Sequence, residues 1–140
     1  MKLTIIESPF AGTPEHSEKE HRDYLDRCIK DSIDRGESPY ASHKMLVDSL
    51  DDSDPEQRKI GIEAGLAWGT MANIIVFYLD YGWSSGMENG LCQHVWPNKV
   101  NAIKKLVEHT AVGGQLRPNL SCRKTHQALV FRKIGKNPTS

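Results

Sequence analysis

The feature that most constrains the fold is an unbroken run of six apolar or aromatic residues, Ile74 to Leu79, which ends on Asp80. Such runs, rich in β-branched and aromatic side chains, are typical of strands buried on both faces of a parallel sheet. Ligands of open α/β sheets bind beyond the carboxyl ends of the strands. We therefore expect the turn after Asp80 to border a binding site, although an acid that only caps the turn would look the same. The residues of that turn and its exit are Ser84, Ser85, Gly86, Met87 and Glu88.

Two further segments with strand character also end on polar side chains. They are Leu3–Ile6 and the short Ser38–Ala41. The residues that follow them are Glu7, Ser8, Pro9 and Phe10 after the first, and Ser42 and His43 after the second. If the three strands are parallel, their carboxyl ends share one edge of the sheet. Carboxylates, hydroxyls and an imidazole at one edge suit a sugar-bearing ligand with many hydroxyl groups.

The segments between the strands predict helices. A capping box begins at Ser17, and Gly36 marks the helix end. A second helix begins at Asp54, with Pro55 at its first position. Residues 44–53 between them are expected to form a loop with at most one helical turn.

Two patterns on the second helix predict how it packs. An apolar stripe at helical spacing indicates the face that meets the core. The residues of this stripe are Ile60, Ala64, Ala67, Trp68 and Met71. Glycines recur at positions 61, 65 and 69, and we expect them to let the helix approach the sheet closely.

Beyond Gly90 the pattern predicts a short helix over 86–93, a helix from Asn98 to about residue 111, and a last strand over Ala128–Phe131. Strand and helix thus alternate along the chain. The expected fold is α/β, with a doubly wound, mainly parallel sheet of four to five strands and helices on both faces, as in Rossmann-like proteins. At 140 residues the chain is expected to form a single domain, 1–140.

Charge is unevenly distributed although the chain is neutral overall. Residues 1–90 carry a net charge of −8, and the basic C-terminal part, 91–140, carries +8. Two solvated faces that attract each other would explain this, as would phosphate contacts made by the basic part. A long nucleic acid is not expected as a partner, because the acidic part would repel it. No stretch reaches the roughly 18 apolar residues of a membrane span.

Cysteine content and short motifs narrow the function further. Three cysteines form no disulfide framework, which predicts a cytoplasmic protein. The P-loop, the GxGxxG fingerprint and the GxSxG elbow do not occur, which argues against kinases, dehydrogenases and ordinary α/β-hydrolases. Two cysteines and two histidines resemble a zinc set, but the spacing in Cys92-Gln-His94 is too short, so we expect no metal and no cofactor.

The acids at the strand ends suit cleavage of an N-glycosidic bond. This reaction passes through an oxocarbenium-like state, which a carboxylate stabilises while a second acid protonates the leaving base. The candidate carboxylates are Glu7, Asp80 and Glu88, with Glu63 from the second helix. Each of them alone is more often a solvated surface acid.

Four segments in order resemble small phage and bacterial domains of the nucleoside 2-deoxyribosyltransferase-like superfamily. These segments are ESPFAG, RGESPYASH, DPEQRKIGIEAGLAWG and the acid-ended LDYG with SSGMENG, and they cover residues 3–90. The resemblance implies a doubly wound fold, deoxyribosyl transfer or N-glycoside hydrolysis, and homo-oligomers in which one subunit completes another's site. If the chain is phage-encoded, it implies the host cytoplasm.

The catalytic set of that superfamily carries over only in part. Its tyrosine falls on Ile5, its nucleophilic glutamate on Gly90, and its helix acid near Gly65. The nearest acids are Glu88 and Glu63, while Asp80 and the turn after it match.

Two hypotheses follow. In the first, the chain acts on an N-glycosidic bond, with Glu88 or Glu7 as nucleophile or stabiliser, Asp80 on the sugar hydroxyls and His43 on the base or as acid–base group. The remaining ligand contacts come from the residues named at the three strand ends and from Glu63. In the second, the chain is a non-catalytic binder that sequesters a nucleotide, such as an ADP-ribose-like or cyclic signal in a phage–host conflict. A structural role on a reused fold is a third reading.

Overall fold

The chain folds into a doubly wound α/β domain, seen in a computed structural model that describes residues 1–108, 120–121 and 127–136. Strands β1, β2, β3 and β5 are parallel, and the two-residue β4 runs antiparallel along β5, in the order β2-β1-β3-β5-β4. The strand bounds are Lys2–Glu7, Glu37–Tyr40, Ile74–Tyr78, Leu120–Ser121 and Ala128–Arg132, for β1 to β5. The expected fold class is confirmed.

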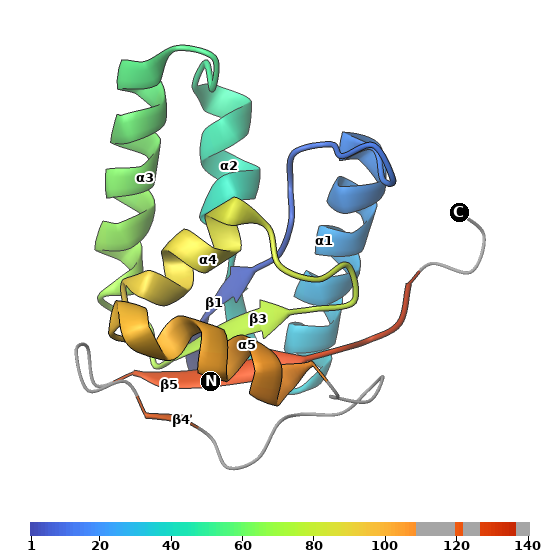
Figure 1. Cartoon of the computed structure of the whole chain (residues 1–140). Coiled ribbons are helices and arrows are strands. Elements are labelled where there is room, and N and C mark those ends of the chain that lie inside the picture. The colour runs from blue at the N-terminus through green and yellow to red at the C-terminus, as the bar shows by residue number, and fades with distance from the viewer. Residues whose placement is uncertain (109–119, 122–126, 137–140) are drawn as a thin grey trace.

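Helices cover both faces of this sheet (Figure 1). Their bounds are Glu18–Asp34 for α1, Ser42–Ser49 for α2, Pro55–Gly69 for α3, Ser85–Cys92 for α4 and Val100–Val107 for α5, which a 3-10 turn, Pro97–Lys99, precedes. Helix α1 packs Tyr24, Leu25 and Cys28 on one face of the sheet. Helices α4 and α5 pack Leu91 and Ile103 on the other. None of the described helices is long and apolar enough to cross a membrane.

The central strand β3 matches the apolar run that predicted it. All five of its residues are buried, because helices lie over both faces. The helix starts are also as expected. Ser17 accepts a hydrogen bond from the backbone N–H of Glu20, and Asp54 accepts one from the N–H of Glu56.

Two predictions along the chain are wrong. Residues 42–49 form the helix α2, where the sequence pattern indicated a loop. The expected cap at Asn98 is also wrong, because this residue lies inside the 3-10 turn and α5 begins at Val100.

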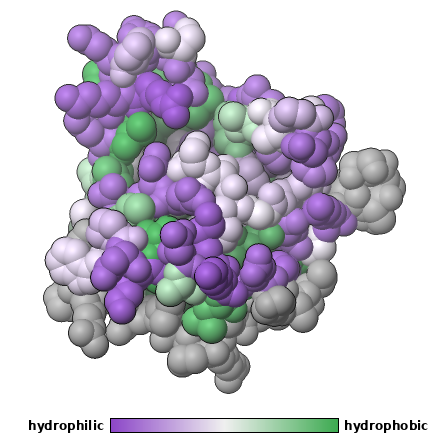
Figure 2. All heavy atoms as spheres, viewed as in Figure 1, coloured by the Kyte–Doolittle hydropathy of each residue, from purple (hydrophilic) through white to green (hydrophobic). Residues whose placement is uncertain are grey.

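Helix α3 packs differently from the expectation. Two of its three glycines approach α2 and not the sheet, since a Cβ built on Gly61 would lie 3.2 Å from Leu50 Cδ1, and one built on Gly65 would lie 2.8 Å from Ser42 Oγ. A Cβ built on Gly69 would meet no atom within 4 Å. The expected apolar face is not buried. Trp68 is 57% exposed and Met71 69%, and no residue of α3 is buried. Figure 2 shows apolar side chains gathered among the polar ones over α3.

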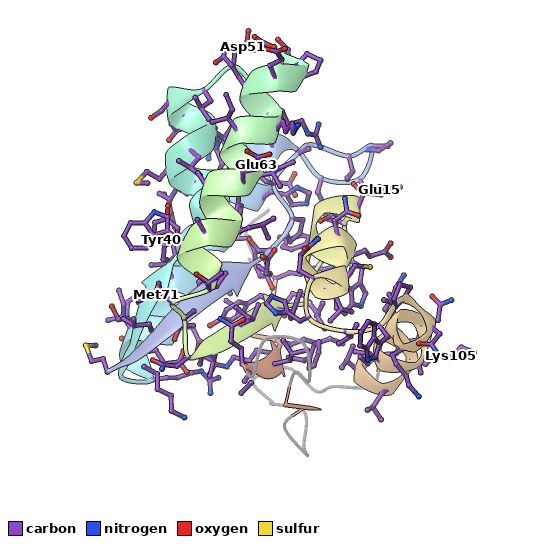
Figure 3. All side chains as sticks on the ribbon, turned by 90° about the vertical axis from the view of Figure 1, so that its left-hand side faces the viewer. Glu15, Tyr40, Asp51, Glu63, Met71 and Lys105 are labelled. Atoms are coloured by element: carbon purple, nitrogen blue, oxygen red, sulfur yellow. The ribbon has the colours of Figure 1, made fainter. Side chains whose placement is uncertain are left out.

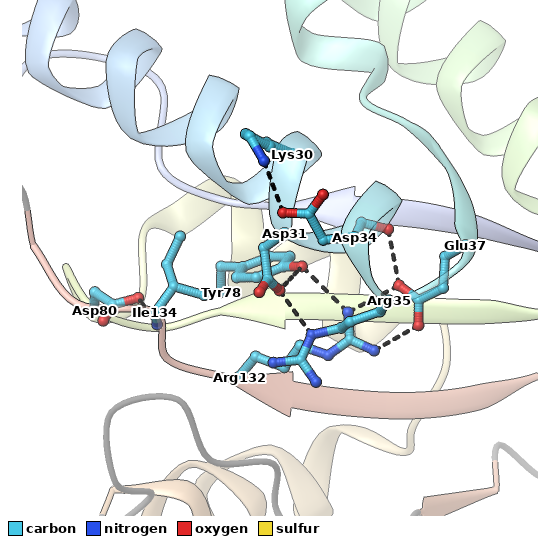
Figure 4. Close-up of polar contacts among 10 residues, drawn as sticks. Lys30, Asp31, Asp34, Arg35, Glu37, Tyr78, Asp80, Arg132 and Ile134 are labelled. Carbon is cyan, nitrogen blue, oxygen red and sulfur yellow. Dashed lines mark hydrogen bonds and ion pairs between the residues drawn. The ribbon is translucent and has the colours of Figure 1, made fainter.

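A buried ion pair links β5 to β2 on the α1 face of the sheet. Arg132 of β5 binds Glu37 of β2 through two parallel hydrogen bonds of 2.8 and 2.6 Å. Tyr78 accepts a further hydrogen bond from Arg132 and donates one to Asp31 of α1, and Arg35 pairs with the same aspartate (Figure 4). This network fixes the sheet at its α1 face and leaves the carboxyl edge to the polar groups described next.

Candidate functional site

The chain reverses its winding direction between β1 and β3. Strand β1 pairs with β2 on one side and with β3 on the other, and Glu7 at its end is in register with Phe77 of β3. In doubly wound folds this switch point leaves a crevice beyond the carboxyl ends of the strands, where ligands bind. Glu7 is therefore the predicted site residue that lies closest to the expected binding crevice.

Glu7 is half-buried at this edge of the sheet, and its carboxyl has no polar partner in the part of the chain that the structure describes. Within the described part of the chain, no hydrogen bond or ion pair reaches it, and burial raises its pKa from the usual 4.5 to about 8. A carboxyl with this pKa holds its proton at pH 7. It is then a hydrogen-bond donor and a potential general acid.

Gly90 of α4 makes room for this carboxyl. A Cβ built on Gly90 would lie 3.1 Å from Glu7 Oε1 and 3.2 Å from Oε2. Only a residue without a side chain leaves the carboxyl where it stands. Gly90 stands where the resemblance places the catalytic glutamate, and in the structure the Glu7 carboxyl lies beside it.

Ser8 and His43 form a second polar pair at the same strand end. The buried Ser8 places its Oγ 3.1 Å from His43 Nε2, at the start of α2. Burial lowers the pKa of His43 to about 4, so that the ring is neutral at pH 7. Glu7 is thus an acid with a raised pKa, and His43 is a base with a lowered pKa. Enzymes that use acid–base catalysis often hold two titratable groups in such different environments.

Phe10 closes one side of this pair. Its ring meets the His43 ring edge-on, with centroids 5.7 Å apart, and the Arg22 guanidinium lies 4.5 Å from its centroid. Pro9 is buried beside it. We call Glu7, Ser8, Phe10 and His43 the Glu7 site.

Asp80 is occupied by internal hydrogen bonds. Its carboxylate accepts one from Tyr24 Oη at 2.5 Å and two from the backbone N–H groups of Ile134 and Gly135, at 2.9 and 2.6 Å. These contacts tie the chain after β5 and helix α1 to the end of β3. Tyr24 was missed by sequence reasoning, although a tyrosine on a buried helix stripe signals that its hydroxyl needs a partner.

The turn after Asp80 leads into α4 as predicted, but Glu88 faces away from the Glu7 site. Ser84 caps the helix by accepting from the N–H of Met87, which is buried. Glu88 pairs with Lys104 of α5. It lies two residues from Gly90, about 200° around the helix, so it points away from Glu7. Ser85 and Gly86 are exposed in the first turn.

The remaining predicted residues lie on α2 and α3. Ser42 opens α2 and packs against Gly65, as described above. Glu63 is exposed, two residues from both Gly61 and Gly65, so it points away from α2 (Figure 3). The structure thus brings Glu7, Ser8 and His43 to one strand end, and it does not bring Glu63 to Ser42.

Within residues 1–108, 120–121 and 127–136, no group of three or more His, Cys, Asp or Glu side chains could hold a metal ion. Cys122 and His126, half of the zinc set considered from the sequence, lie outside the described residues.

The fold and the polar strand ends define a doubly wound α/β protein with a carboxyl-edge site. A family model described as a domain of unknown function (DUF7768) matches residues 2–99, and the chain belongs to this family. The match includes every residue of the Glu7 site. No curated protein and no solved structure matches the chain.

Proposed function

We propose that this protein binds a nucleoside or nucleotide at the Glu7 site and cleaves its N-glycosidic bond. The observation that carries the proposal is the half-buried, unpartnered carboxyl of Glu7 at the switch point of the sheet. Polar groups withdrawn from water normally have partners, and a titratable group with a strongly shifted pKa that lacks one marks a candidate functional site. The resemblance to nucleoside 2-deoxyribosyltransferase-like domains supports this choice of ligand.

The protonation states assign the roles. Glu7 is protonated at pH 7, so it acts as an acid and not as the nucleophile that the sequence suggested. It gives its proton to the ring nitrogen of the base as the C–N bond breaks and its electron pair moves to the base. Water adds to the anomeric carbon and gives its proton to neutral His43. His43 then releases this proton to solvent and the Glu7 carboxylate takes one up from solvent, which restores both groups.

A second candidate function is sequestration without cleavage. Glycoside chemistry commonly uses two carboxyl groups on either side of the bond. Here Glu88 faces α5 and Asp80 is held by three internal donors, so neither supplies the second carboxylate in this arrangement. A binder of a nucleotide, an ADP-ribose-like compound or a cyclic signal needs only one such group.

One incubation separates the two functions. The protein is mixed with deoxynucleosides, nucleotides, NAD and cyclic nucleotides, then removed by filtration and denatured, and both fractions are analysed by mass spectrometry. Free base in the filtrate supports cleavage, while an intact compound recovered only from the protein supports sequestration. Glu7→Gln should abolish either result and Glu15→Gln, at an exposed loop position, should preserve it. A wild-type protein that changes neither fraction would contradict both functions.

The homo-oligomer that the resemblance implies stays a prediction. A single-chain mass of 15.7 kDa in light scattering would contradict it.

A further inference from the structure

The hydroxyl of Tyr40 is buried without a hydrogen-bond partner. Tyr40 ends β2, and its ring packs on the core cluster of Ile5 and Leu91 and against the Trp68 indole, with centroids 5.3 Å apart. Figure 3 shows it on β2, close to the lower end of α3. The fully buried tyrosines, Tyr24 and Tyr78, both have hydrogen-bonded hydroxyls.

Tyr40 and Glu7 share one face of the sheet. Tyr40 is in register with Ile5 on the neighbouring strand. Glu7 follows Ile5 by two residues, and side chains two apart on a strand point to the same side. Helix α4 covers this face, since its Leu91 joins the cluster around Tyr40 and its Gly90 touches Glu7.

Leaving such groups unpaired is costly. A buried donor without a partner has lost its hydrogen bonds to water and gained none in return. The Tyr40 hydroxyl is in this condition. The half-buried Glu7 carboxyl, on the neighbouring strand and under the same helix, also has no hydrogen-bond partner among the described residues. A ligand that met both groups would recover this free energy on binding.

We infer that Tyr40 is a further ligand-contacting residue of the Glu7 site, and that the part of the ligand held between its hydroxyl and the Glu7 carboxyl is uncharged and offers both a donor and an acceptor. This inference rests on the proposed function. A phenol and a protonated carboxyl each donate and accept hydrogen bonds, which matches an amide-like or amidine-like edge.

A phosphate does not fit the same position. A buried phosphate needs a pairing cation, and none of the salt bridges in the described residues includes Glu7. Burial is the only cause of its pKa shift, with no Lys or Arg acting against it. A phosphorylated ligand would therefore place its phosphate elsewhere.

Tyr40→Phe tests the inference, because it removes only the hydroxyl. The free variant should melt at or above the wild-type temperature, because no internal hydrogen bond is lost and an unpaired buried hydroxyl is removed. The matched control, Tyr78→Phe, loses hydrogen bonds to Asp31 and Arg132 and should melt about 4 °C lower. The probes are the four 2′-deoxynucleosides and their 5′-monophosphates. Tyr40→Phe should weaken binding of the preferred probe about tenfold, by the same factor with and without the phosphate.

Three results would overturn the inference. A melting temperature of Tyr40→Phe as low as that of Tyr78→Phe would show that its hydroxyl has an internal partner, whether or not any probe binds. If Tyr40→Phe binds the preferred probe as tightly as wild type and melts no lower, the Tyr40 hydroxyl does not contact the ligand. If wild type binds none of the eight probes, the proposed function fails for this class of ligand and the ligand contact fails with it.

Discussion

Replacing Glu7 by Gln should change how the stability of the protein depends on pH. The folded pKa of Glu7 is about 8, against 4.5 for the free side chain. Between these values only the folded state holds the proton, so its stabilising effect is complete below about pH 4.5 and is lost as the pH rises through 8. At about 1.4 kcal/mol per pH unit, the wild-type free energy of unfolding falls by about 3–4 kcal/mol from pH 5 to pH 8 through this group alone.

Urea unfolding at pH 5, 6, 7 and 8 measures this effect as the difference between variants. Glu7→Gln lacks the titrating group, so its free energy of unfolding should rise relative to wild type at each step. The difference should grow by about 3–4 kcal/mol over the series. Other titrating groups cancel in this comparison, and Glu15→Gln, at an exposed position, should run parallel to wild type.

Parallel pH profiles of Glu7→Gln and wild type would refute the reasoning. They would mean that the Glu7 carboxyl ionises normally in the folded protein, as it would if solvent or a cation reached it. Glu7 would then not be a proton donor at neutral pH.

Three further results are expected. Because burial lowers the folded pKa of His43 to about 4 from the usual 6.5, this group alone lowers the wild-type free energy of unfolding by about 3 kcal/mol as the pH falls from 6.5 to 4, while protonation of Glu7 acts in the opposite direction. In urea unfolding, the free energy of His43→Gln should therefore rise relative to wild type by about 3 kcal/mol over this range, and parallel profiles would contradict this. Gly90→Ala improves helix propensity but pushes a Cβ against the Glu7 carboxyl. It should therefore unfold at the same or higher urea concentration yet release base at least tenfold more slowly in a chromatographic assay, and wild-type activity would contradict this. Arg132→Met removes the cation from the buried Glu37 carboxylate, which keeps only the hydrogen bond from Ser32, and should lower the free energy of unfolding by about 3–5 kcal/mol in urea titrations. A loss below about 1 kcal/mol would contradict a buried pair.

The sequence predicted the elements whose signals are local. The run Ile74–Leu79 is apolar because helices cover both faces of β3, and Ser17 is a cap because its hydroxyl meets a donor three residues away. Such signals can be recognised without knowing which elements pack against each other in the fold. The parallel arrangement of β1, β2 and β3 then brought the expected strand ends to one edge.

The errors concern partners distant in the sequence. Asp80 looked like a free acid at a strand end, but its donors come from Tyr24, 56 residues earlier, and from the chain after β5. The glycines of α3 were expected to meet the sheet, whereas Gly61 and Gly65 meet α2, which the sequence did not reveal as a helix. Glu88 is the acid nearest in sequence to Gly90, where the catalytic glutamate was expected. The two are two positions apart on the helix, so Glu88 lies on the opposite side of α4, where it pairs with Lys104.

The most direct test of the Glu7 site is a carbon NMR titration of the protein with its glutamate carboxyl carbons labelled. The account predicts one glutamate resonance that titrates near pH 8, is absent from Glu7→Gln, and moves when the preferred nucleoside or nucleotide is added. If every glutamate titrates near its usual pKa of 4.5, or if the Glu7 resonance does not respond to a ligand that binds, the central claim is wrong.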